Sequence, residues 1–327
     1  GTQQNSGSGN GQGGLLSGVQ RPSVNYMPGS GRVLFTGGQN PSVSTSIDMT
    51  MIKTKGNSSS FGTLATGMRS MSSASSLTRS LSAGGYGSDY TNAIRSVEFA
   101  SQGNDSNFGD LIAPTYDPQN GVVGNTTRGI FAGGHVSPTQ TNVIQYVTIA
   151  SVSNATDFGD LSTGRQSMAG MTSNTRGVFG GGTVAPSPYV VNIMEYITIA
   201  STSNTTDFGD LSATRTEATG LSSSTRGIIA GGDTGAPSII NIIEYITMAS
   251  TSNTTDFGDL TESRYNFASG SDSITGIFAG GSTPSDSNVI DFITIASTGN
   301  AADFGDITSA RRGLVGTSDS HGGLQSS

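Results

Sequence analysis

Apolar and polar positions recur along the chain in four strand-length phrases that keep the same order. One complete copy runs from Arg215 to Ser263 and reads RTEATGLSSS, TRGIIAGG, INIIEYITMAS and TSNTTDFGDLTES. The second phrase holds a short continuous apolar run, which is typical of a strand covered on both faces. The third is rich in β-branched residues and carries an aromatic, which also favours a strand. Each copy therefore predicts four strands.

Pairs of glycines mark the repeat and set its length. The first glycine of each pair falls at positions 37, 84, 133, 181, 231 and 280, so the spacing is 47 to 50 residues. Self-similarity at this period with four strands per unit predicts a β-propeller. Six units of four strands give 24 strands, and residues 311–316 (RRGLVG) repeat the first phrase once more. We expect an all-β, six-bladed propeller of four-stranded antiparallel blades over residues 21–327, closed by strand 311–316.

A phenylalanine at a fixed register ends each unit. It lies 12 residues after the aromatic position of the third phrase and is followed by glycine. A large ring at constant register can fill the space between adjacent blades, and the glycine permits a bulge or a close backbone approach. The twin glycines likewise suit strand ends with positive φ. We expect six blade-packing residues: Phe61, Phe108, Phe158, Phe208, Phe257 and Phe304.

Residues 1–20 have no period and are rich in Gly, Ser, Gln and Asn. Such a segment cannot bury enough apolar surface to order itself, which predicts a flexible N-terminal arm. The alternative is an arm that docks onto a neighbouring subunit through Leu15 and Leu16. Residues 21–27 compete with 311–316 for the closing strand, but Pro22 and Pro28 weigh against them because proline donates no ladder hydrogen bond.

The connection between the second and third strands varies in length, from 8 to 11 residues after the first glycine, whereas the connection between the third and fourth does not. In a four-stranded blade the loops after strands two and four lie on the same face. Variable loops on a rigid ring are where binding usually occurs. Segment 112–120 (IAPTYDPQN) adds an irregular connection on that face. The candidate ligand-binding residues are Tyr86, Asp89, Tyr90, Tyr116, His135, Tyr189, Asp233 and Asp286, and the alternative is that they are ordinary exposed loop residues.

Charge and composition exclude several partners. The formal net charge is -8 with a pI near 4.6, which argues against nucleic acid because phosphate binding needs a basic surface. No stretch approaches the roughly twenty apolar residues of a membrane helix, so no membrane insertion is expected. Cysteine is absent, which removes disulfides and thiolate ligands.

Few residues of the chain could act in catalysis or bind a metal ion. His135 and His321 are the two histidines and lie far apart, so a histidine metal cluster is excluded and a Ser-His-Asp triad would need one of them. The repeated aspartates, such as Asp157 and Asp160, offer too few carboxylates for calcium. We expect them to cap turns and to pair with arginines such as Arg165, Arg176, Arg215 and Arg226. The sequence thus predicts no catalytic residue, no metal and no cofactor.

The order of phrases resembles the kelch repeat over about residues 21–316. The features that carry the resemblance are Arg215, the Gly231-Gly232 pair, Tyr245 and Phe257. Kelch units usually place tryptophan in the fourth strand, whereas this chain has none and uses phenylalanine. The resemblance implies a propeller.

A more specific set of motifs is similar to kelch-like repeat proteins of phages that infect marine cyanobacteria and related marine bacteria. These motifs are residues 256–260 (DFGDL), 225–227 (TRG) and 320–324 (SHGGL). That resemblance implies a non-catalytic virion structural protein at the particle surface, often in tail fibres. Its partners would be other virion proteins and a host cell-surface glycan or lipopolysaccharide, with a homo-oligomer left open. One alternative is a decoration (cement) protein with virion partners alone. Another is a glycan-processing enzyme that uses tyrosine, arginine and carboxylates as six-bladed sialidases do.

Overall fold

The computed structural model describes residues 27–186, 189–235 and 238–320, which form strands and loops. The described ranges contain no helix of the length and apolarity needed to cross a membrane. The expected arm at 1–20, with Leu15 and Leu16, lies outside these ranges, as do Pro22 and His321.

The strands form small antiparallel sheets, which we number in chain order. The first sheet consists of β28 (Arg312–Ser318), β1 (Arg32–Gln39), β2 (Ser46–Met51) and β3 (Ser59–Thr63). The second consists of β4 (Ser72–Ser75), β5 (Arg79–Ala83), β6 (Ala93–Glu98) and β7 (Ser106–Asp110). The third has three strands, β8 (Arg128–Ala132), β11 (Val143–Thr148) and β12 (Thr156–Asp160).

The remaining large sheets each have four strands. The fourth consists of β14 (Ala169–Thr172), β15 (Arg176–Gly180), β18 (Ile193–Thr198) and β19 (Thr206–Asp210). The fifth consists of β20 (Thr219–Ser222), β21 (Arg226–Ala230), β22 (Ile242–Thr247) and β23 (Thr255–Asp259). The sixth consists of β24 (Ala268–Ser271), β25 (Thr275–Ala279), β26 (Val289–Thr294) and β27 (Ala302–Asp306).

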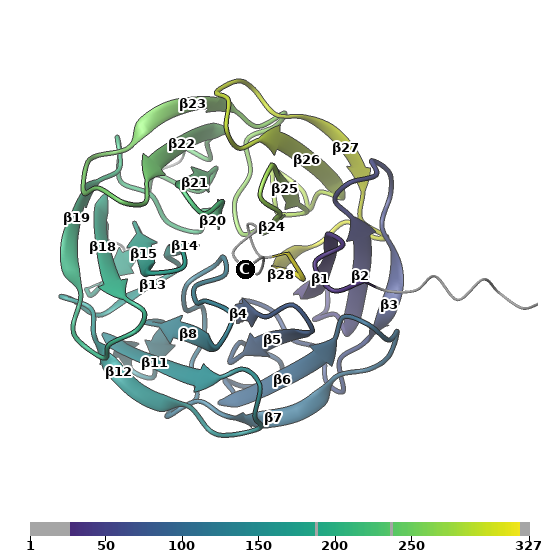
Figure 1. Cartoon of the computed structure of the whole chain (residues 1–327), viewed down its shortest axis with the longest axis horizontal. Helices are drawn as coiled ribbons and strands as arrows, with labels where there is room; N and C mark the ends of the chain where they lie inside the picture. The colour runs from purple at the N-terminus through teal and green to yellow at the C-terminus, as the bar shows by residue number, and fades with distance from the viewer. Residues whose placement is uncertain (1–26, 187–188, 236–237, 321–327) are drawn as a thin grey trace, which may run out of the picture.

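The sheets lie around a common axis in a propeller-like arrangement (Figure 1). In the four-stranded sheets the strands nearest the axis are β28, β4, β14, β20 and β24, and the strands at the rim are β3, β7, β19, β23 and β27. β28 pairs antiparallel with β1, with Val33 opposite Ser318, so segments from near the two ends of the described chain share the first sheet.

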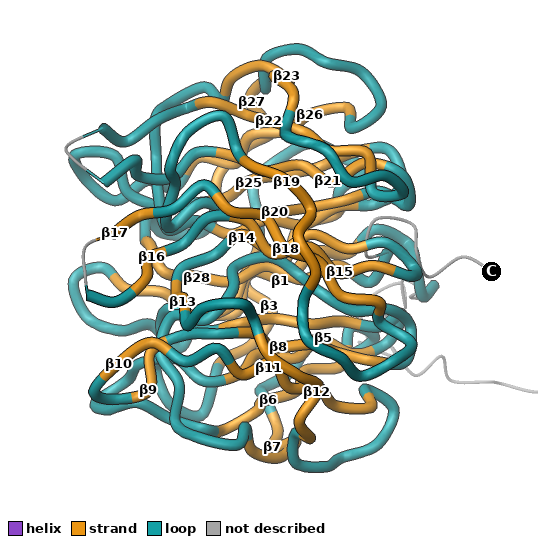
Figure 2. Tube along the Cα trace, turned by 90° about the vertical axis from the view of Figure 1, so that its left-hand side faces the viewer, coloured by secondary structure: helices purple, strands orange, loops and turns teal. Residues whose placement is uncertain are grey.

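Small hairpins extend from one end of the axis. They comprise β9 (His135–Val136) with β10 (Thr139–Gln140), and β13 (Arg165–Gln166) with β16 (Thr183–Val184) and β17 (Tyr189–Val190). Figure 2 shows β9, β10, β16 and β17 together on one side of the molecule. They belong to the connections of variable length, and we call this side the hairpin face.

The third sheet departs from the expected four strands. Segment 112–120 approaches the axis where an inner strand would lie, and the side chain of Gln119 takes over part of the pairing with β8. Its Nε2 donates to the carbonyl oxygen of Ile130 at 2.9 Å, and its Oε1 accepts from the N–H of Ala132 at 2.5 Å. A side-chain amide carries one donor and one acceptor group in the same plane, as a peptide unit does. The main chain pairs with β8 as well, because the N–H of Gln119 donates to the carbonyl of Ala132 at 3.2 Å and the N–H of Ile130 donates to the carbonyl of Val123 at 3.0 Å. An irregular segment, completed by the Gln119 amide, therefore takes the place of the inner strand.

The phenylalanines of the fourth strands pack between neighbouring sheets. Phe158 belongs to a buried cluster with Ile144 of its own sheet and Phe179 and Ile197 of the next, and it contacts Tyr146 edge to face. The following Gly159 lies at a register shift and has a φ of 148°. A Cβ there would come within 2.3 Å of the carbonyl oxygen of Ser203 in the next unit.

The expected pairing of the repeated aspartates with arginines is wrong. Arg165 and Arg215 instead form buried ion pairs with Glu195 and Glu244 of the third strands. Arg176 and Arg226 belong to a set at the start of the second strands whose guanidinium groups donate to a carbonyl of the next sheet. The pairs, with the donating arginine first and the residue of the accepting carbonyl second, are Arg32–Phe99, Arg79–Ile149, Arg128–Ile199, Arg176–Met248 and Arg226–Ile295. A carbonyl accepts without the cost of burying a second charge.

Candidate functional site

Four of the candidate residues from variable connections meet on the hairpin face. The rings of Tyr90 and Tyr116 are stacked, with centroids 5.5 Å apart and planes inclined by 6°. Tyr86 meets both rings edge to face, and His135 meets Tyr90 in the same way at 5.6 Å. We call these four residues the aromatic cluster.

Backbone pairing brings the cluster together. Tyr86 pairs with Tyr90 across a hairpin turn, and Tyr116 pairs with His135. Two connections after second strands and one after a fourth strand therefore supply the rings. The sequence could group them because such connections share a face, but it could not show which would touch.

Arg69 anchors the cluster from beneath. Its guanidinium carbon lies 5.1 Å from the ring centre of Tyr86 and 5.2 Å from that of Tyr116. Its Nη1 also donates to the hydroxyl oxygen of Tyr116 at 2.7 Å. Cation–π contacts stabilise by about 0.5–2 kcal/mol depending on desolvation. Arg69 was not among the predicted residues.

A groove of about 390 Å³ opens beside the cluster. Tyr90, Tyr116 and His135 line it together with Pro138 and Pro186. Gln140 and Gln166 contribute amides, joined by a 3.2 Å hydrogen bond from Gln140 Nε2 to Gln166 Oε1. His135 Nδ1 is buried and has no hydrogen-bond partner among the described residues. The groove thus combines flat aromatic faces with hydrogen-bonding amides, and its lining contains no Asp, Glu, Lys or Arg side chain.

A ring of backbone hydrogen bonds surrounds the axis beneath the hairpins. Its members occupy the same position in each unit, and each donates its N–H to the carbonyl of the member before it: Ser70 to Gly313, Asp117 to Ser70, Ser167 to Asp117, Glu217 to Ser167, Asn266 to Glu217 and Gly313 to Asn266. All six have positive φ. We call this set the axial ring, and its hydrogen bonds return to their starting point.

Two acids of the axial ring titrate abnormally. Burial, and then the charges of Asp117 and Asp233, raise the pKa of Glu217 to about 8. Burial also raises the pKa of Asp117 to about 6, opposed by a hydrogen bond from Ser167 and by the charge of Arg69. Burial disfavours the charged form of both carboxyl groups, and neighbouring carboxylates add to this effect at Glu217 alone.

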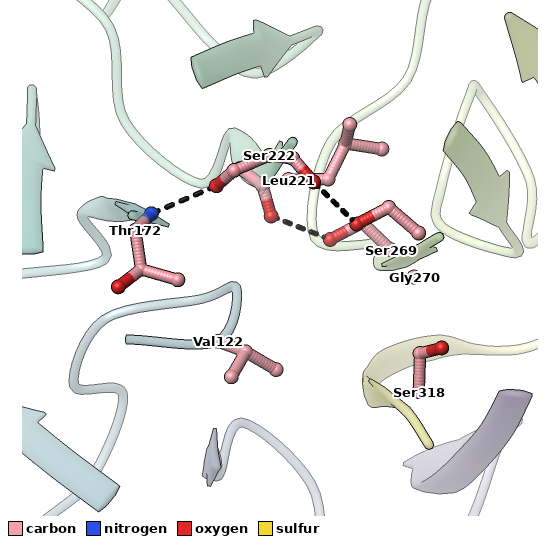
Figure 3. Close-up of a pocket in the computed structure, with 9 residues that line it drawn as sticks. Val122, Thr172, Leu221, Ser222, Ser269, Gly270 and Ser318 are labelled. Atoms are coloured by element: carbon pink, nitrogen blue, oxygen red, sulfur yellow. Dashed lines mark hydrogen bonds between the residues drawn. The ribbon is translucent and has the colours of Figure 1, made fainter. Parts of the chain in front are cut away.

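The axis is tightly packed away from the hairpin face. Figure 3 shows the axis-facing ends of the inner strands, where Thr172 N donates to Ser222 Oγ at 2.7 Å. Ser269 Oγ donates to the carbonyl of Gly220 at 2.7 Å. The space between these residues is about 20 Å³, which is room for about one water molecule. This part of the axis is therefore too small for a ligand larger than about one water molecule.

The other candidate residues lie apart from the groove. The side chain of Asp89 accepts the N–H of Tyr90 at 2.8 Å, and Asp233 accepts that of Gly235 at 2.7 Å. Asp286 pairs with Arg312 at 2.9 Å. Tyr189 is 62% exposed on β17. Three of these four therefore hold local structure.

The described residues contain no group of three or more His, Cys, Asp or Glu side chains arranged to hold a metal ion. No protein-family model matches this chain, and neither does any curated protein.

Proposed function

We propose that this chain is a six-bladed kelch-like propeller that presents its hairpin face as a binding surface on a virus particle. The six-unit architecture is supported by the axial ring, whose hydrogen bonds pass through all units and return from Gly313 to Ser70. A second circuit supports it at the rim. There an asparagine side chain of each unit accepts a backbone N–H from the unit before, with Asn57 accepting from Asp306 at 3.1 Å to join the last unit to the first.

The proposed ligand is a glycan of the host cell surface. The observation that carries this is the groove, in which Tyr90, Tyr116 and His135 offer flat apolar faces beside two glutamine amides. Sugar rings have apolar faces that stack on aromatics and hydroxyls that hydrogen-bond to amides. The proline residues Pro138 and Pro186 stiffen the surrounding loops and reduce the ordering cost of binding.

Binding without catalysis is favoured by the state of Tyr116. A glycan-processing site of the sialidase type would use this tyrosine as a nucleophile, with Arg69 and carboxylates around it. Burial, and then the charge of Asp117, raise the pKa of Tyr116, which disfavours the reactive phenolate. The same constellation then serves as a rigid platform. Release of reducing sugar from host polysaccharide by the purified chain would establish the enzyme instead.

The virion role is tested by immunogold electron microscopy of purified particles with antibodies raised against this chain. We expect label on the tail fibres or another exposed surface, and absence of the chain from particles would refute the role. Binding of the purified chain to host cells tests whether the hairpin face is the binding surface. Tyr90→Ala should abolish binding, whereas Ile274→Ala, at an exposed turn between β24 and β25, should leave it unchanged.

A further inference from the structure

A buried ion pair recurs in four sheets, between an arginine that precedes the first strand and an acid of the third strand. The pairs are Arg165 with Glu195, Arg215 with Glu244, Arg264 with Asp291, and Arg311 with Asp48. Each arginine side chain is at most 1% exposed. The guanidinium group is thus a packed component of these sheets.

Backbone carbonyls provide the other hydrogen-bond acceptors around this guanidinium group. We call the complete set of acceptors the guanidinium seat. In the sixth sheet, Arg264 Nη1 donates to the carbonyls of Gly280 and Val289 at 3.1 and 2.9 Å. Its Nη2 reaches the carbonyl of Phe278 at 3.3 Å and the carboxylate of Asp291 at 2.7 Å. The seat therefore consists of three carbonyls and one carboxylate, all acceptors, which suits the five donors of a guanidinium.

The second sheet has the seat without its arginine. Met68 occupies the position of the arginine, and Arg95 occupies that of the acid. A different carboxylate substitutes for the missing acid. Asp105 Oδ1 accepts the N–H of Ala65 at 2.7 Å, just as Glu195 Oε1 accepts the N–H of Ser162 at 3.1 Å in the fourth sheet.

A pocket of about 250 Å³ lies where the guanidinium would be. Ser82, Gly84 and Ala93 line it, and these are the counterparts of the three residues whose carbonyls hold Arg264. Met68 and Met71 line the apolar part, and the exposed Asp89 lies at the mouth. The pocket therefore retains the acceptor positions of the seat together with an apolar wall.

Asp105 supplies an acceptor that is not in use. Its side chain is 1% exposed, and Oδ2 accepts no hydrogen bond from the described residues. The cation beside it is Arg95, whose Nε lies 3.6 Å away, beyond hydrogen-bonding distance, and whose side chain is 32% exposed. The 3.6 Å separation and the exposure of Arg95 make this pair weak, so a better-placed guanidinium can displace Arg95.

We propose that this pocket binds the guanidinium group of an arginine side chain carried by another polypeptide. The planar fork donates to the carboxylate of Asp105 and to the carbonyls of Gly84 and Ala93, while its methylene stem packs on Met68 and Met71. Two carboxylates, Asp89 and Asp105, against one arginine favour a cation. A lysine ammonium is compact and cannot span the separated acceptors as the fork does. This pocket is distinct from the aromatic groove, and Tyr90 lines both.

The test uses the full chain with methionine methyl groups labelled with ¹³C, because Met68 and Met71 report directly on the pocket. The probe is N-acetyl-arginine methylamide, and the matched control is its citrulline analogue, which has nearly the same shape without the charge. We expect the arginine compound to shift both methyl signals in a saturable manner and the citrulline compound to leave them in place. Equal shifts from both compounds, or none from either, would overturn the proposal.

Substitutions in the pocket test whether binding occurs at this site. Asp105→Asn should weaken binding by at least about tenfold through loss of a charge-assisted hydrogen bond, whereas Asp89→Asn at the mouth should change it by less than about twofold. Met68→Arg combined with Arg95→Glu rebuilds the pair of the other sheets, and the Met71 signal should then no longer respond. If the rebuilt variant does not fold, Asp105→Asn decides alone, and undiminished binding by that variant refutes the site.

Discussion

Arg311 Nη1 lies 2.9 Å from Asp48 Oδ2 in a buried ion pair that joins a residue next to β28 with one on β2. In the fourth sheet the equivalent pair, Arg165 and Glu195, comes from a single repeat unit. In the first sheet the arginine and the acid come from opposite ends of the described chain. One side-chain contact therefore fixes the late strand against the early ones.

Loss of this carboxylate should destabilise the whole fold. Asp48→Asn leaves Arg311 buried without its counter-charge, and breaking a buried pair in this way costs about 3–5 kcal/mol. Chemical denaturation measures the change in the free energy of unfolding. Asp157→Asn, at an exposed position, is the control and should change it by less than about 0.5 kcal/mol. A loss below about 1 kcal/mol for Asp48→Asn would show that the pair does not tie the two ends together.

Stability should fall as pH rises from about 5 to 8. The pKa of Glu217 is raised from 4.5 to about 8 in the folded chain, so over this interval the folded state binds more protons than the unfolded state. The stability from the neutral carboxyl is complete below pH 4.5 and is lost as pH passes through 8. Because Glu217 is partly solvated, we expect a loss of about 1–3 kcal/mol.

Glu217→Gln should remove most of this slope and should stabilise the chain at pH 8. Asp117, with a pKa raised to about 6, accounts for the remainder between pH 4 and 6. Thermal unfolding followed at several pH values measures both effects. Asp207→Asn, at an exposed site, should retain the full slope, and a Glu217→Gln variant with an unchanged slope would place the titration elsewhere.

Backbone contact at the axis makes one glycine irreplaceable. A Cβ on Gly220 would lie 2.2 Å from the carbonyl oxygen of Gly170 in the neighbouring inner strand. Gly220→Ala therefore forces two strands apart and should cost about 1–3 kcal/mol or more, as overpacking does. Gly103→Ala is the matched control, since a Cβ there meets nothing within 4 Å. Similar melting temperatures for the two variants would contradict the tight packing of the axis.

The sixth sheet offers a stabilising substitution. Thr275 occupies the position that Arg226 has in the fifth sheet. Arg226 lies over the ring of Tyr245, whereas the equivalent ring of Phe292 is covered by Lys55 of the first unit, whose Nζ lies 3.7 Å from the ring centre. Thr275→Arg would place a guanidinium over the same ring and within reach of the Ile52 carbonyl. We expect a gain of about 0.5–1 kcal/mol when it is combined with Lys55→Ala, relative to Lys55→Ala alone. No gain would show that Lys55 does not substitute for the arginine.

Strand positions were predictable because each phrase repeats its apolar pattern. The third phrase at 192–201 contains β18 (Ile193–Thr198), and the glycine pairs have positive φ as expected. The aromatic cluster could be foreseen as a set of loop residues. Its geometry depends on cross-loop pairing, such as Tyr116 with His135, which has no local signal.

Other features could not be read from residue types. The axial ring is conserved between units in backbone conformation while its side chains differ, as Asp117, Glu217 and Gly313 show. The buried pairs did leave a signal, because Glu195, Glu244 and Asp291 occupy one register of the third strands. The pairing of the Gln119 side chain with β8 left none, since a single glutamine looks like any loop residue.

The proposal that the hairpin face binds glycan is tested most directly by titrating the purified chain with oligosaccharides released from the host cell surface. The chain has nine tyrosines and no tryptophan, so its intrinsic fluorescence reports on tyrosines such as Tyr90 and Tyr116. We predict a saturable fluorescence change that Tyr90→Ala and Tyr116→Ala each abolish and that Ile274→Ala preserves. Saturable binding that survives both tyrosine substitutions, or no binding by the unaltered chain, would contradict the account.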